Sequence, residues 1–190
     1  MRFLDVLTGR RKLVKPANDR LFALSTAYVT METSLSITSS GKAAIVFQPL
    51  ATADFQGIVA EMEEVVRATS AESGTSVRTS DDSYGYRWLI LQGGDFDALV
   101  AGIHAVSSAI EAGGYGERVL CAVFAFADTD RRRLYWIYNY KRGAFYPFVP
   151  ASGAEQRDNE RELVLKAQIG SELPVETDLS RWFPLWGIPI

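Results

Sequence analysis

The sequence contains a single cysteine and a single histidine among its 190 residues. One thiol cannot form a disulfide within the chain, which favours a reducing compartment, and one cysteine with one histidine cannot assemble a typical zinc site. The cysteine, Cys121, lies in the apolar run 119–126, where we expect it to pack as an inert, small apolar side chain. The sequence therefore predicts no metal site.

Long apolar runs and catalytic signatures are also missing. No stretch approaches the roughly 18 apolar residues of a membrane span, and the start of the chain is charged too soon for a secretory signal, so we expect a cytoplasmic protein. The sequence has no GxxxxGK[ST], no GxGxxG after a predicted strand, no HExxH and no GxSxG. These absences predict a protein without enzyme activity, catalytic residues or a cofactor.

The composition that remains is that of an ordinary globular protein, with 47% hydrophobic, 12% aromatic and 23% charged residues. A chain of this length buries roughly 70% of its unfolded surface and needs no disulfides to stabilise a core. We expect one domain at 18–190, including an apolar C-terminal tail from about residue 174 onward, and a separate N-terminal arm at 1–17.

Charge is divided unevenly between the arm and the domain. The net charge is −3, yet residues 1–16 carry five cationic side chains against Asp5 alone, so they carry +4 and the remainder −7. An acidic domain argues against nucleic-acid binding. Residues 2–8 place apolar side chains at helical spacing, so the arm can lie on an anionic membrane, dock on a protein partner or fold onto its own domain. Its candidate contact residues are Arg10, Arg11, Lys12 and Lys15.

Hydrophobic periodicity predicts the first elements. Period-two alternation over 29–37 predicts a strand, Ser39-Ser40-Gly41 a turn, and 43–48 the hairpin partner of that strand. Apolar residues at i, i+3, i+4 and i+7 then predict an amphipathic helix around 55–66.

Further strands and helices follow downstream. The segment 118–127 is apolar on both faces, which predicts a central strand, and two prolines in and after 144–148 predict an edge strand. The other expected elements are strands at 75–80, 84–92 and 133–141, a helix from Asp95 to about residue 110, and a polar helix at about 156–169.

These elements are arranged as ββα, ββα, βββ and α units. Successive hairpins with helices between them imply an antiparallel sheet whose helices lie mainly on one face. The predicted fold class is therefore α+β.

Paired carboxylates provide the one candidate for ligand chemistry. Asp81 and Asp82 can bind a cation or share a proton, but Asp-Asp-Ser is also what a hairpin turn requires. We favour the turn, for these residues and for Asp128 and Asp130, and keep as the alternative a metal- or small-molecule-binding domain or enzyme that uses the Asp81/Asp82 region. His104 lies on the apolar side of a predicted helix, which favours a partly buried structural histidine.

Two aromatic segments are candidates for contact with partners. The hairpin at 131–148 fits packing in the core, a protein interface or, less well given the acidic domain, an RNA-stacking surface. The tail fits docking on its own sheet or exchange with a groove on a partner. The candidate contact residues are Tyr140, Lys141, Arg142, Phe145, Tyr146, Trp182 and Trp186.

Five segments together resemble the PspAB family of small proteins associated with the phage-shock protein PspA. They are MRFLDVLTGRRKLVKP, DSYGYRWLIL, YKRGAFYPFVP, RDNERELVLK and LPVETDLSRWFPLWG, in this order from Met1 to Trp186. KRGAFYPF and DLSRWFPLWG are the specific pieces, whereas FLDVLTG is a common amphipathic opening.

The resemblance implies an accessory role in an envelope-stress response. PspA-type proteins are coiled-coil oligomers that remodel membranes on the inner face of the cytoplasmic membrane. We therefore expect a non-enzymatic adaptor that binds a PspA-type protein and contacts anionic membrane peripherally. Whether the chain forms homo-oligomers, and whether it activates or restrains its partner, is open.

Overall fold

A six-stranded sheet is the centre of the fold. The computed structural model describes residues 18–72, 74–152 and 155–190, so the arm with its four candidate contact residues lies outside the described part. The strands are antiparallel and are ordered β2-β3-β1-β4-β5-β6. They are β1 (Thr38–Phe47), β2 (Thr75–Asp81), β3 (Arg87–Gly93), β4 (Val119–Ala127), β5 (Arg133–Asn139) and β6 (Ala144–Phe148).

Strand β1 lies in the middle of the sheet because residues 43–47 are apolar toward both faces and all are buried. The predicted turn at 39–41 is wrong, since these residues belong to β1. The register with β4 shifts between Ser39 and Lys42, and Gly41 takes a φ of +65°. Ser-Ser-Gly here makes a bulge, which needs the same conformational freedom as a turn but lets the strand continue.

The predicted strand at 29–37 is also wrong. A 3-10 turn, η1 (Asn18–Phe22), continues into helix α1 (Ala23–Leu35). The buried residues of this helix recur every three or four positions and are Leu24, Ala27 and Met31. The β-branched Val29, which supported the strand, is 60% exposed on the outer side of the helix. Tertiary packing of one narrow stripe outweighs the β propensity of this segment.

The remaining elements follow the predictions closely. Helix α2 (Ala53–Glu72) contains the expected amphipathic segment, and α3 (Phe96–Ala112) begins after Asp95, whose carboxylate accepts a hydrogen bond from the Ala98 amide at 2.7 Å. Helix α4 is Asn159–Ile169, and β6 is an edge strand as predicted. The expected central position of β4, between β1 and β5, is confirmed.

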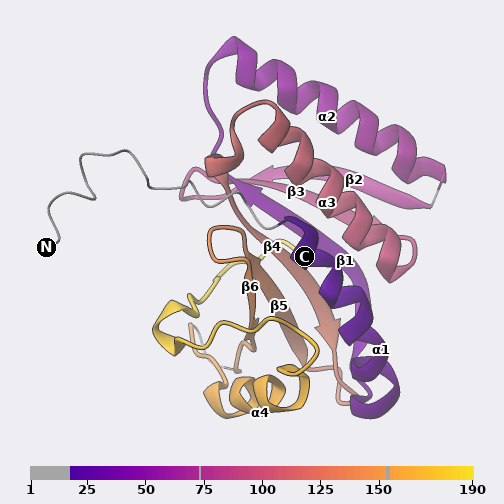
Figure 1. Ribbon diagram of the computed structural model, residues 1–190, viewed down its shortest axis with the longest axis vertical. Coiled ribbons are helices and arrows are strands. Elements are labelled where there is room, and N and C mark those ends of the chain that lie inside the picture. The colour runs from indigo at the N-terminus through magenta and orange to yellow at the C-terminus, as the bar shows by residue number, and fades with distance from the viewer. Residues whose placement is uncertain (1–17, 73, 153–154) are drawn as a thin grey trace, which may run out of the picture.

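The helices cover one face of the sheet. Figure 1 looks onto this side, where α1 and α3 lie in front of the strands and α2 lies alongside α3 at the top of the view. Alternate residues along the strands point toward the helices, among them Phe47, Leu89 and Phe124. These residues share one apolar cluster with Met31 of α1 and Leu99 of α3. The prediction of helices mainly on one face is thereby confirmed.

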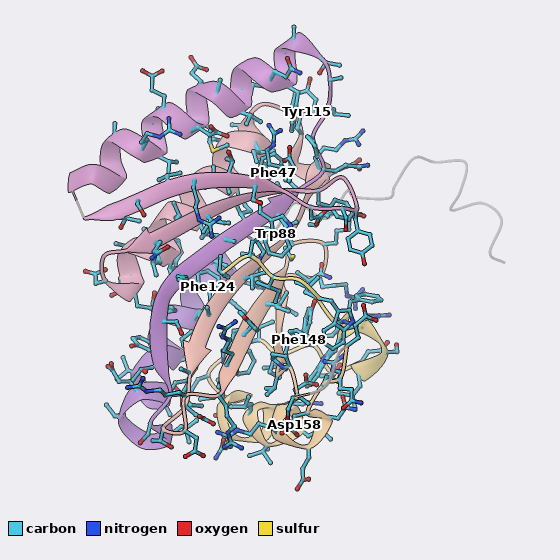
Figure 2. All side chains as sticks on the ribbon, turned by 180° about the vertical axis from the view of Figure 1, so that it is seen from behind. Phe47, Trp88, Tyr115, Phe124, Phe148 and Asp158 are labelled. Atoms are coloured by element: carbon cyan, nitrogen blue, oxygen red, sulfur yellow. The ribbon has the colours of Figure 1, made fainter. Side chains whose placement is uncertain are left out.

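The C-terminal tail covers the opposite face. The strand residues that point to the other face, including Trp88 and Phe148, form a second apolar cluster with Trp182 and Ile190. Trp186 also packs against this cluster. Figure 2, seen from behind, shows the last part of the chain crossing the sheet on the side where Trp88 and Phe148 are labelled. Docking of the tail on its own sheet, one of the two interpretations open from the sequence, is confirmed.

The α+β class with an antiparallel sheet is confirmed, but the first unit of the predicted order is not. The described chain begins with a helix and a single strand in place of the first hairpin, so its order is α, β, α, ββ, α, βββ, α. Strand β1 pairs with β3 and β4, whereas the sequence predicted a hairpin with residues 29–37. The first strand of the chain therefore lies in the centre of the sheet, with later strands on both sides.

Candidate partner-binding surfaces

The aspartates of the β2–β3 connection serve the turn itself. Asp82 accepts hydrogen bonds from the amides of Tyr84 and Tyr86 and from the indole nitrogen of Trp88, each at 2.9 Å. Asp81 forms a two-point ion pair with Arg87, at 2.7 and 2.9 Å, which holds the pKa of the Asp81 carboxyl below its usual value. The turn interpretation is confirmed, and both carboxylates have partners without any ligand.

The second aspartate turn has the same architecture. Asp128 accepts hydrogen bonds from the amides of Asp130 and Arg132 and from the Arg132 guanidinium. Burial raises the pKa of Asp128, but the hydrogen bonds from Arg132 outweigh burial, so the pKa lies below its usual value. This carboxylate is therefore a buried anchor for the turn between β4 and β5.

The two residues singled out for their rarity are structural. His104 packs its ring 4.8 Å from the ring of Phe22, at a 46° tilt, and so joins α3 to η1. Cys121 lies against the tail-side cluster, and burial raises the pKa of its thiol to about 12. At neutral pH this thiol stays protonated and is a poor nucleophile and metal ligand.

The aromatic hairpin belongs to the core. Tyr140 and Phe145 are buried on the helix side of the sheet, and Tyr146 is buried on the tail side. Burial raises the pKa of the Tyr140 and Tyr146 hydroxyls. Core packing, one of the interpretations open from the sequence, is confirmed for these rings, and an RNA-stacking surface would need them exposed.

The charged residues of the hairpin are divided between an ion pair and the solvent. Arg142 donates to the buried carboxylate of Glu176 at 3.0 Å and thereby ties β6 to the start of the tail, whereas Lys141 is exposed. In the tail, Trp182 is buried and Trp186 partly buried. Contact of the hairpin and tail residues with a partner stays a prediction. In this structure a partner can reach exposed side chains such as Lys141, but not the buried Trp182.

An ion pair inside the domain fixes the tail to α4. Arg157 lies 2.7 Å from the carboxylate of Glu162 and donates a hydrogen bond to the carbonyl of Trp182 at 2.6 Å. The same carboxylate accepts the amide of Val149 at 2.9 Å. Burial is the main reason that the pKa of Glu162 is raised, and the hydrogen bonds from Arg157 and Val149 lower it only in part.

The first candidate surface lies beside this anchor. A hollow of about 100 Å³, which we call the α4–tail hollow, is lined by Arg157, Asn159, Glu162, Leu163, Leu179 and Trp182. Leu163 and Leu179 are exposed apolar side chains of this lining, and Phe183, the residue after Trp182, is also exposed. This surface is not evident in the sequence, because Leu163 lies in a helix predicted to be polar. Leu179 and Phe183 lie in a tail expected to bury its apolar residues.

The second candidate surface lies between two helices. An apolar groove of about 410 Å³ runs between α2 and α3 on the outside of the helical layer, and we call it the α2–α3 groove. Its α2 side includes Val65, which is 61% exposed. The lining residues are Ile58, Glu61, Met62, Val65, Val66, Ala105, Ala109 and Gly113.

In the described ranges, no three side chains of His, Cys, Asp or Glu lie close enough together to hold a metal ion. None of the described helices combines the length and the apolar character of a membrane-crossing helix.

Comparison with known proteins identifies the family. No curated protein and no solved structure matches the chain. The family described as PspAB, PspA associated protein B, matches residues 1–190, the entire sequence. The resemblance seen in the sequence is thereby confirmed, and the chain belongs to the PspAB family.

Proposed function

We propose that this chain is a non-enzymatic adaptor that binds a PspA-type coiled-coil protein at the inner face of the cytoplasmic membrane, as part of an envelope-stress response. The observation that carries the proposal is the match to a PspA-associated family over all 190 residues. The family description implies association with PspA; direct binding, the cytoplasmic location and the peripheral membrane contact are our proposal.

The α4–tail hollow is the contact surface that we propose for this partner. A helix of the partner can present an apolar side chain on its exposed side, and a small hollow walled by Leu163, Leu179 and Trp182 can accept one such side chain. The rim carries the charges of Arg157 and Glu162, which are already paired with each other. A partner therefore gains apolar contact here without leaving a buried charge unpaired.

A binding titration with a purified PspA-type protein from the same cell tests this surface. We expect Phe183→Asp and Leu163→Asp to weaken binding at least about tenfold, because a charge in a buried contact carries a full desolvation cost. Tyr84→Asp is the matched control, since Tyr84 is also an exposed aromatic residue, 74% exposed against 57% for Phe183, on a distant turn. Equal binding by Phe183→Asp and Tyr84→Asp variants would exclude this surface; no binding by the wild-type chain would exclude the direct adaptor role.

A further inference from the structure

The α2–α3 groove lacks a cover among the described residues, and its shape suits a short apolar helix. Met62 and Val66 lie at its buried base, while Val65 on α2 and Ala105 on α3 line it as exposed residues. The α3 side carries only Ala and Gly, so an incoming helix can approach its backbone closely. At Gly113 the two helices already touch, because a Cβ there would lie 2.6 Å from Ile58 Cδ1 of α2, so the room for an incoming helix lies beside Ala105 and Ala109.

The rim of the groove is acidic. Glu61 lines the groove as an exposed side chain, and the exposed Glu64 follows three residues later on α2. Apolar lining with an acidic rim selects an occupant that has an apolar face and basic flanks. A second copy of the acidic domain does not meet this requirement, because its net charge would oppose the rim.

One segment of this chain does meet the requirement. Residues 3–7 place Phe3, Leu4 and Leu7 at helical spacing, and residues 10–15 add four basic side chains directly after them. The arm thus combines the apolar face that the groove accepts with the positive charge that the rim attracts.

The arm starts at α3, the helix that forms one wall of the groove, and is long enough to reach the groove. The described chain begins with η1, which packs on α3 through the contact of Phe22 with His104, the residue before Ala105 of the groove. The eleven peptide units from Leu7 to Asn18 span up to roughly 35 Å when extended. From His104 to Gly113 the helix advances only about 14 Å, so every position along the groove is within reach.

We propose that residues 3–7 of the arm dock in the α2–α3 groove of the same chain, with the basic residues 10–15 over the rim formed by Glu61 and Glu64. The docked arm buries the same apolar side chains that would insert into a membrane. An anionic membrane and the groove therefore compete for the arm, and the groove holds the arm until such a surface is present. Docking in the groove needs no protein partner, whereas the competition with a membrane rests on the membrane contact in the proposed function.

A nitroxide attached to an Ala101→Cys variant tests docking in the full-length chain. Ala101 is exposed on α3, one turn before Ala105, and Cys121 is replaced by serine in the same chain so that the nitroxide attaches at position 101 alone. We expect the oxidised label to broaden the amide signals of residues 3–8 strongly and reversibly. Sharp signals for these residues would overturn the proposal. A mixture of spin-labelled chains with chains that carry no label tests for contact between molecules. Broadening that arises only between molecules would also overturn the proposal, because the arm would then dock in a second copy.

Two valines provide a matched pair of variants. Val65 lies in the groove and is 61% exposed, whereas Val29 lies on α1 outside the groove and is 60% exposed. Val65→Lys should abolish the broadening and Val29→Lys should leave it unchanged; Ala105→Lys on the opposite wall serves as a second groove variant if Val65→Lys does not fold. Equal broadening in the groove variants and in Val29→Lys would contradict docking in this groove.

Vesicle binding tests the competition separately. Val65→Lys and Val29→Lys each add one positive charge. A difference in their affinity for phosphatidylglycerol vesicles therefore does not arise from net charge. We expect Val65→Lys to bind roughly threefold or more tightly than Val29→Lys, because release from the groove raises the fraction of molecules with a free arm. Equal affinities would overturn the claim that the groove withholds the arm from the membrane.

Discussion

Arg157 and Glu162 form an ion pair of 2.7 Å whose side chains are only 18% and 2% exposed. The pair sits where three parts of the fold meet. Glu162 belongs to α4, its carboxylate accepts the amide of Val149 just after β6, and Arg157 holds the carbonyl of Trp182 in the tail. Arg157 also lies over the ring of Phe148, 5.5 Å from its centroid. The tail-side core therefore depends on a buried charge pair as well as on apolar contact.

Removing one member of this pair should destabilise the protein strongly. Glu162→Ala leaves the Arg157 cation without its partner and the Val149 amide without its acceptor, for which we expect a loss of about 3–5 kcal/mol in the free energy of unfolding. Urea unfolding followed by tryptophan fluorescence measures this. Glu160→Ala, an exposed position on the same helix, should change the stability by no more than about 0.5 kcal/mol. A Glu162→Ala variant as stable as Glu160→Ala would show that the pair contributes nothing.

Two neighbouring aromatic residues of the tail should behave in opposite ways. Trp182 is buried and its indole nitrogen donates to the carbonyl of Glu176 at 3.0 Å, whereas Phe183 is exposed. We expect Trp182→Ala to cost about 3–5 kcal/mol and Phe183→Ala no more than about 0.5 kcal/mol. Thermal and urea unfolding of both variants distinguish them. Similar losses for the two would mean that the tail does not pack on the sheet as described.

Acid should weaken the β4–β5 turn through Asp128. The pKa of its carboxyl lies below the ordinary 3.8 in the folded protein, so the unfolded chain binds the proton more readily. The stabilisation is complete above about pH 4 and is lost as the pH falls through the folded pKa. Asp128→Asn should therefore differ from the wild type more at pH 7 than at pH 3 in urea unfolding. Asp97→Asn, on the first turn of α3, controls for removal of a carboxylate, and a difference that grows in acid would contradict this sign.

Cys121 should react only when the protein unfolds. Burial raises the pKa of its thiol to about 12, so at pH 8 almost no thiolate is present in the folded state, whereas an unfolded cysteine has a pKa of about 8.5. Alkylation by iodoacetamide, followed by mass spectrometry, should be slow in buffer and fast in concentrated urea. Rapid alkylation of the folded protein would mean that the strand around Cys121 opens readily.

The sequence was sufficient for those elements whose periodicity has one interpretation. The stripe of α2, the Asp95 cap of α3 and the two-sided apolar pattern of β4 each exclude the alternatives, and each prediction is confirmed. The segment 23–37 has two interpretations, because residues 29–37 alternate with period two while Leu24, Ala27 and Met31 also fit a helix. Packing against α3 and the sheet decides between them, and that contact is not visible in local sequence.

The candidate surfaces were harder to predict because aromatic residues serve cores and interfaces equally well. Tyr140, Phe145 and Tyr146 were candidates for partner contact, yet the register of β5 and β6 buries all three. The α4–tail hollow joins residues of α4 with residues some twenty positions later, and the α2–α3 groove joins two helices that are separated by a hairpin. Only the folded arrangement brings such residues together.

Recovery of partners from the native cell tests the central claim most directly. A tagged chain, cross-linked in living cells and purified from the membrane fraction, should carry a PspA-type protein as its main partner. A Leu163→Asp/Phe183→Asp double variant, folded and equally abundant, should lose it. Equal recovery by the variant would contradict the proposed surface. Absence of any PspA-type protein from the wild-type sample would contradict the adaptor function itself.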